Sequence, residues 1–126
     1  MSAAQLEAYR TAQKSVMSGR EIEAMALTKA ALQLKKCRNN WDIDDRDGKR
    51  FESLKFNQDI WTILQGELAK DDNPLPLQLR QDLLSLSLFV DRRTFDIMAF
   101  PSPEKLDILI NINLNIAAGL RSNPSQ

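Results

Sequence analysis

The sequence contains no histidine and only one cysteine, Cys37. Histidine is the commonest general base and metal ligand in proteins, so its absence argues against most catalytic and metal-binding sites. One cysteine forms neither an intrachain disulfide nor a zinc cluster, and we interpret Cys37 as a small apolar residue of a reduced protein. No stretch approaches the roughly 20 apolar residues of a membrane span. The N-terminal segment lacks the basic and apolar regions of a secretory signal, so we expect a cytoplasmic protein.

Glycine and proline are also scarce, with four and five residues, and Lys plus Arg equals Asp plus Glu at 17 each. We therefore expect no long flexible linker and interpret residues 1–126 as a single domain with enough chain to form a core. The zero net charge gives no general attraction for nucleic acid or anionic lipid. Without a glycine-rich phosphate loop or a serine–histidine pair, we expect no cofactor and a binding protein rather than an enzyme.

Apolar residues recur at helical spacing along most of the chain. This pattern predicts an all-α protein, a compact bundle of four to five helices with an N-terminal amphipathic helix. The predicted helices span 3–17, 18–39 after a Ser18–Glu21 capping box, 50–70, Asn73 to the Phe100-Pro101 stop, and Ser102-Pro103 onward. The acidic loop 39–49 does not fit a calcium-binding EF-hand, because aligning Gly48 puts apolar residues at ligand positions.

The segment from Ile108 to Ile116 alternates between apolar and polar residues and resembles a strand by pattern. No other segment offers a strand for pairing, so we predict a helix. That helix places Asn113 in the middle of its apolar face. An unsatisfied buried amide costs about 1–3 kcal/mol, so Asn113 either bonds a neighbouring helix or marks a face that meets a partner. Trp61 shares a face with Leu54, Leu64 and Leu68, widened by Ile60 and Ile63, which predicts a core position.

The helix after Asn73 carries apolar residues on two sides, although a surface helix needs only one apolar stripe. One side should face the core and contains Leu79, Leu86, Val90 and Ile97. The other is our candidate partner-binding surface and contains Leu77, Leu84, Leu88 and Phe95. The alternative is that the N-terminal helix, with Leu6, Tyr9 and Val16, folds over this second stripe. Arg80, Arg93 and Asn113 complete the candidate set; for the arginines, a solvated face with ion pairs is the alternative.

Several strings of residues, in their order and spacing, carry a family resemblance. They are Asn73-x-Leu75-Pro76-x-x-Leu79-Arg80, Ser85-Leu86-x-x-Phe89-Val90-x-x-Arg93-Thr94, Leu109-Ile110-x-Ile112-Asn113-x-x-Ile116, Asn57-x-x-x-Trp61 and Ser18-x-Arg20-Glu21. From about Tyr9 to Leu120 the chain resembles FlaF, a family of flagellar biosynthesis regulators. The resemblance implies a protein that promotes flagellin synthesis or secretion, with flagellin as partner in the manner of an export chaperone. The alternative it implies is a regulator of flagellin mRNA, acting directly or through the translational regulator FlbT. The zero net charge favours the first.

Overall fold

The computed structural model describes residues 2–42 and 48–122, apart from the side chains of residues 10–19 and 122. The regular elements within these residues are helical: α1 (Ala3–Asn39), α3 (Lys49–Leu68), α4 (Leu77–Ala99), the 3-10 turn η1 (Pro103–Lys105) and α5 (Leu106–Ser122). The all-α prediction is confirmed, and α5 includes the whole segment for which a strand was the alternative. Residues 43–47 of the predicted acidic loop lie outside the described residues. No described helix is both long and apolar enough to cross a membrane.

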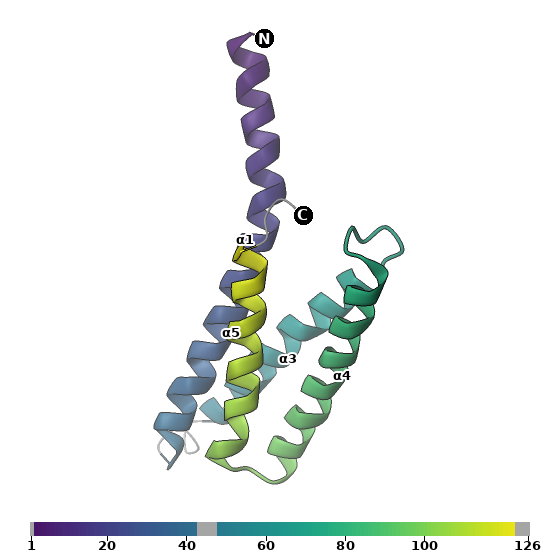
Figure 1. The fold of residues 1–126 in the computed structure, drawn as a ribbon. Helices are drawn as coiled ribbons and strands as arrows, with labels where there is room; N and C mark the ends of the chain where they lie inside the picture. The colour runs from purple at the N-terminus through teal and green to yellow at the C-terminus, as the bar shows by residue number, and fades with distance from the viewer. Residues whose placement is uncertain (1, 43–47, 123–126) are drawn as a thin grey trace.

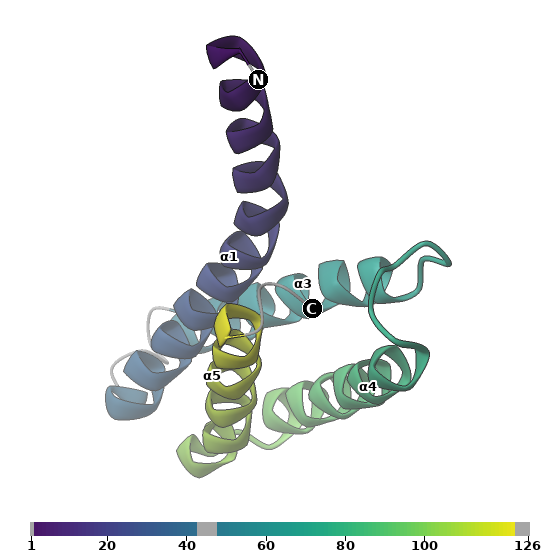
Figure 2. The ribbon, with the colours of Figure 1, turned by 45° about the horizontal axis from the view of Figure 1, so that its top comes forward.

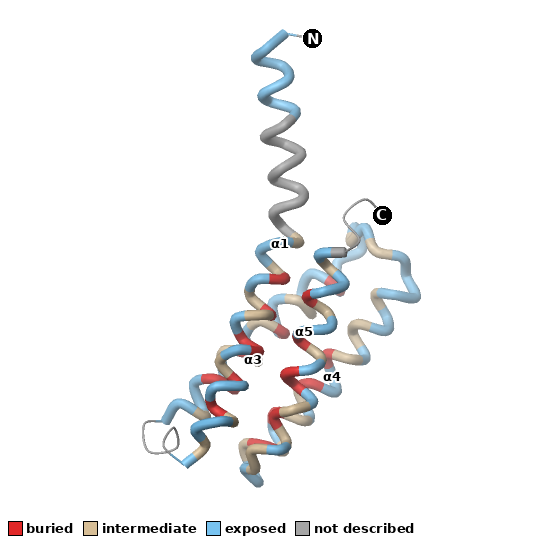
Figure 3. Tube along the Cα trace, turned by 60° about the vertical axis from the view of Figure 1, so that its left-hand side comes forward, coloured by how far each residue is buried: buried red, intermediate tan, exposed pale blue. Residues whose placement is uncertain are grey.

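The four long helices pack around one core. α5 lies along the second half of α1, α3 packs on α1, and α4 packs mainly on α3 and meets α5 near the η1 turn (Figures 1 and 2). Buried positions gather where these helices face one another, whereas the described start of α1 is exposed (Figure 3). The largest fully buried apolar side chains are those of Trp61, Leu27, Leu34, Ile97, Leu106, Leu109 and Val90. The predicted core position of Trp61 is therefore confirmed, whereas Ile63, on the outer side of α3, is exposed.

The predicted break between two N-terminal helices is wrong, because α1 is continuous from Ala3 to Asn39. A capping box at Ser18 would require non-helical backbone there. Gly19 inside a helix costs only about 1 kcal/mol relative to alanine, and the surrounding Ala, Leu, Glu, Gln, Lys and Met residues all favour continuation. A capping box does start the helix, but it is formed at Ser2. The Ser2 hydroxyl accepts from the Gln5 N–H at 3.2 Å, and the Ser2 N–H donates to Gln5 Oε1 at 2.9 Å.

The start of α4 also differs from its prediction. Asn73 does not cap the helix, and neither proline lies in its first turn, because α4 begins at Leu77 with Pro76 as the N-cap residue. A residue that precedes proline is disfavoured in helical conformation, and this excludes Leu75 from the helix. The Asn73 side chain instead accepts from the Leu75 N–H at 3.0 Å and closes a local turn.

The end of α4 and the start of α5 agree with the sequence. α4 ends at Ala99, and the N–H of its C-cap residue Phe100 donates to the Asp96 carbonyl at 2.8 Å. After Pro101 the chain makes the η1 turn, whose first residue is Pro103, and continues directly into α5. Proline explains both events, since it stops one helix and is tolerated in the first turn of the next.

The inner face of α4 combines apolar and small polar side chains. Four buried residues form it, Ser87, Val90, Thr94 and Ile97. The Ser87 hydroxyl donates to the Leu84 carbonyl at 2.6 Å and the Thr94 hydroxyl to the Val90 carbonyl at 2.7 Å, so both are satisfied within α4. Leu79, which was predicted to face inward, is 44 % exposed. Val90 and Ile97 of the predicted inner side are buried, and Ser87 and Thr94 widen the buried face. Leu79 lies on the same line of the helix as Ile97, 18 residues later, so its exposure follows from its place in the first turn of α4.

Candidate partner-binding surface

The second stripe of α4 lies on the surface of the folded protein. Leu77, Leu88 and Phe95 are 59 %, 55 % and 62 % exposed, and Leu84 between them is half-buried. We call these four residues the α4 stripe. At about 1.5 Å per residue they extend over about 27 Å of helix. Large apolar side chains scattered singly over a surface are ordinary, but a row of them at helical spacing is typical of a binding surface.

The N-terminal helix does not cover the α4 stripe. The first half of α1 points away from α4 and projects beyond the rest of the protein (Figures 1 and 2). Leu6 and Tyr9, two of the three residues that would provide the covering contacts, are themselves 39 % and 60 % exposed. The side chain of the third, Val16, is outside the part of the chain that the structure describes. The alternative in which this helix folds over the stripe is therefore wrong, because α1 is one continuous helix that cannot turn back on itself.

The two candidate arginines occupy different places. Arg80 lies one helical turn before Leu84, beside the α4 stripe, and its Nη1 donates to the Lys70 carbonyl at 2.7 Å, which joins the start of α4 to the end of α3. Arg93 precedes Phe95 by two residues, which places it about 200° around the helix and away from the stripe. Arg80 can therefore act with the stripe, whereas Arg93 belongs to another face of α4.

Asn113 lies in the interior rather than beside the stripe. Its side chain is fully buried where α1, α3 and α5 meet. Its Oδ1 accepts from Trp61 Nε1 at 2.9 Å, and its Nδ2 donates to Asn57 Oδ1 at 2.6 Å and to the Leu27 carbonyl at 3.2 Å. These bonds connect the three helices through one amide. Of the two alternatives for Asn113, the structure therefore shows the bond to neighbouring helices and not a face that meets a partner.

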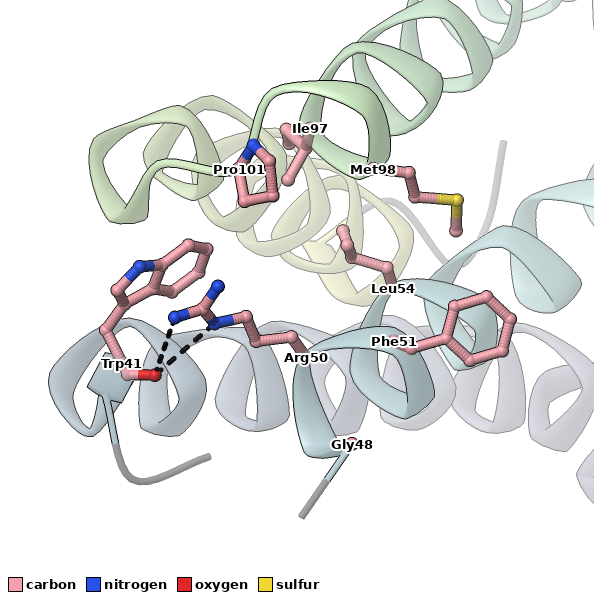
Figure 4. Close-up of a pocket in the computed structure, with 8 residues that line it drawn as sticks. All are labelled: Trp41, Gly48, Arg50, Phe51, Leu54, Ile97, Met98 and Pro101. Atoms are coloured by element: carbon pink, nitrogen blue, oxygen red, sulfur yellow. Dashed lines mark hydrogen bonds between the residues drawn. The ribbon is translucent and has the colours of Figure 1, made fainter. Parts of the chain in front are cut away.

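A separate apolar hollow lies where the end of α1, the start of α3 and the end of α4 come together (Figure 4). Phe51, Met98 and Pro101 contribute to its lining. Arg50 is the one charged residue among those that line it, and its Nε and Nη2 donate to the Trp41 carbonyl at 3.3 and 3.1 Å. The same guanidinium stacks over the Trp41 ring, 3.7 Å from the ring centre. Sequence periodicity could not find this hollow, because its residues come from two separate stretches of the chain, 41–54 and 97–101.

The pKa of one acidic side chain, Glu23 of α1, is shifted by burial and in part by Glu67 of α3. The pKa of the half-buried Glu23 carboxyl is raised by burial and by the nearby Glu67, while Arg20 partly opposes the shift. Groups of three or more His, Cys, Asp or Glu side chains placed to hold a metal ion do not occur among the described residues.

The fold and this surface define a class: an all-α protein that presents a row of apolar side chains along an exposed helix. The chain belongs to the FlaF family, since the family model described as flagellar protein FlaF matches residues 5–120. The resemblance of its sequence strings is thereby confirmed, and the protein is a flagellar protein. The match extends from the first turn of α1 to the last turn of α5. Neither a curated protein nor a solved structure matches the chain significantly.

Proposed function

We propose that this FlaF-family protein binds flagellin and promotes its synthesis and secretion as an export chaperone, without catalysing a reaction. The observation that carries the proposal is the α4 stripe, which stays exposed although the inner face of α4 is already packed by other side chains. In a protein of a flagellar family, the flagellar subunit itself is the natural candidate for an amphipathic partner.

The stripe is suited to one helix of flagellin. Its residues are separated by seven, four and seven positions, which keeps them on one line of a helix with 3.6 residues per turn. Recognition of an amphipathic helix uses anchors at such spacings. Burying a Leu or Phe side chain contributes roughly 1.5–3 kcal/mol before ordering costs, so a few anchors are enough for a reversible complex. Arg80 beside the stripe would add a positive charge for an acidic side chain of the partner.

Charge substitutions on the stripe test the proposal. Leu88→Asp and Phe95→Asp should abolish flagellin binding, measured by calorimetry with purified flagellin, and should leave the melting temperature nearly unchanged because both side chains are exposed. Phe89→Asp is the matched control, since Phe89 is also exposed but lies about 100° around α4 from Leu88. Unfolding of the free Leu88 and Phe95 variants would identify the stripe as core and move the binding site elsewhere.

Regulation of flagellin mRNA, directly or through FlbT, is the competing function. The zero net charge supports only weak RNA binding without sequence preference. Tight and sequence-selective binding of flagellin leader RNA by the purified protein, at physiological salt, would reverse the ranking of the two functions.

A further inference from the structure

The N-terminal part of α1 forms a helical arm with no other described helix running alongside it. We define the arm as residues 3–20. α5 ends beside the point where the arm joins the domain, because Arg121 in the last turn of α5 lies 3.7 Å from the Glu21 carboxylate. Figures 1 and 2 show the arm continuing past this end of α5 with no other helix alongside it. The arm belongs to the shared sequence of the family, since the family match begins at Gln5.

The buried stripe of α1 continues into the arm without a change of direction. Five helical turns of 3.6 residues span 18 residues, so Leu6 lies on the same line as Ala24, and Tyr9 on the same line as Leu27. Ala24 and Leu27 are fully buried in the domain core, whereas Leu6 and Tyr9 are exposed. Leu6 and Tyr9 therefore extend the line of side chains that packs inside the domain, but they remain exposed.

The length of the arm matches that of one helix. The arm has 18 residues and α5 has 17, which correspond to lengths of about 27 and 26 Å. A helix of this length without tertiary contacts is marginal in water, because most helical stability in proteins comes from packing of the apolar face. A partner helix that lies end to end with α5 along α1 would supply that packing.

We infer that the arm is a second docking site, which takes an amphipathic helix with acidic flanks from the bound flagellin as a continuation of α5. This inference rests on the proposed function. The charge of the arm favours such a partner over a second copy of this chain. Its sequence contains three basic residues, Arg10, Lys14 and Arg20, against one acidic residue, Glu7, so two arms side by side would bring like charges together.

Hydrogen exchange of the full-length protein, with and without purified flagellin, tests the inference. We expect the backbone amides of residues 3–20 to exchange fast in the free protein and at least about tenfold more slowly in the complex. Leu6→Asp and Tyr9→Asp should remove this protection and weaken flagellin binding by about tenfold to a hundredfold, since each removes one buried apolar anchor. Ala8→Asp is the matched control, because Ala8 lies about 200° around the helix from Leu6.

The other outcomes separate the two proposals. If flagellin binds but exchange in the arm stays fast, the arm is not a docking site, while the α4 stripe retains its role. If protection appears with rising protein concentration in the absence of flagellin, the occupant is a second copy and the inference is overturned. If the wild-type protein does not bind flagellin, the proposed function fails, and this inference with it.

Discussion

Replacing Asn113 with alanine should destabilise the protein much more than the same replacement at Asn57, although both side chains are fully buried. The two changes remove the same atoms, so they leave similar cavities, and their difference reports the hydrogen bonds. Asn113 joins three groups: it accepts from Trp61 Nε1 and donates to Asn57 Oδ1 and to the Leu27 carbonyl. The Asn57 side chain makes one of these bonds, and its Nδ2 has no hydrogen-bond partner among the described residues.

The magnitude follows from the groups that each change leaves unpaired. Asn113→Ala leaves Trp61 Nε1 and Asn57 Oδ1 without partners, and at about 1–3 kcal/mol per buried group this adds about 2–6 kcal/mol to the cavity term. In Asn57→Ala, Asn113 Nδ2 keeps its bond to the Leu27 carbonyl. The change also deletes the unpaired Asn57 Nδ2, which offsets part of the cavity term. We therefore expect the free energies of unfolding of the two variants to differ by at least about 2 kcal/mol.

Urea denaturation followed by far-ultraviolet circular dichroism measures this difference. Asn111→Ala is the control, because Asn111 is exposed on the same helix and its change should stay within about 0.5 kcal/mol of the wild type. Equal destabilisation by Asn113→Ala and Asn57→Ala would refute the reasoning. It would mean that the Asn57 amide is fully bonded, or that the donor and acceptor atoms of the two amides are arranged differently.

Two further predictions concern the core and the charge between α1 and α3. Trp61→Ala should lower the free energy of unfolding by about 3–5 kcal/mol, because it empties a fully buried site, and an unchanged urea midpoint would contradict this. Glu23→Gln should raise the melting temperature at pH 7. The folded-state pKa of Glu23 is raised, so the folded protein prefers the protonated carboxyl, and stability falls as pH rises above the ordinary value of 4.5. The gain should shrink as the pH falls from above the raised folded-state pKa of Glu23 toward 4.5, and a gain that is the same at pH 4.5 and pH 7 would contradict this.

Local signals in the sequence predict most of the helices. Phe100-Pro101 marks the end of α4, and helical spacing identifies α5 despite its alternating pattern. These features are readable because proline geometry and side-chain periodicity act over a few residues. The same local logic fails at Ser18 and Asn73. Serine and asparagine both suit a helix cap. The residues around Ser18 nevertheless favour continuation of the helix, and those after Asn73 form a turn before Pro76.

The burial of small polar residues is the main reason that the faces of α4 are only partly predictable. Ser87 and Thr94 count as polar in any periodicity, yet both are fully buried, because each hydroxyl bonds a carbonyl of its own helix. Their burial widens the inner face beyond Val90 and Ile97. Leu79 is exposed for another reason, since it lies in the first turn of α4. The α4 stripe, on the other hand, is identified correctly as a row of apolar side chains from sequence spacing alone.

The sequence by itself determined that the protein is helical, without histidine chemistry, and supplied with more apolar helix surface than one small core requires. Only the tertiary structure decided where that surface lies. α4 docks on α3 and leaves the α4 stripe in solvent, while α5 ends beside Glu21 and leaves Leu6 and Tyr9 uncovered. Contacts between helices also place Asn113 in the interior, where it bonds Trp61 and Asn57. These outcomes depend on contacts between different helices, such as Gln65 with Asp91 and Trp61 with Asn113, and no helical period within one segment encodes them.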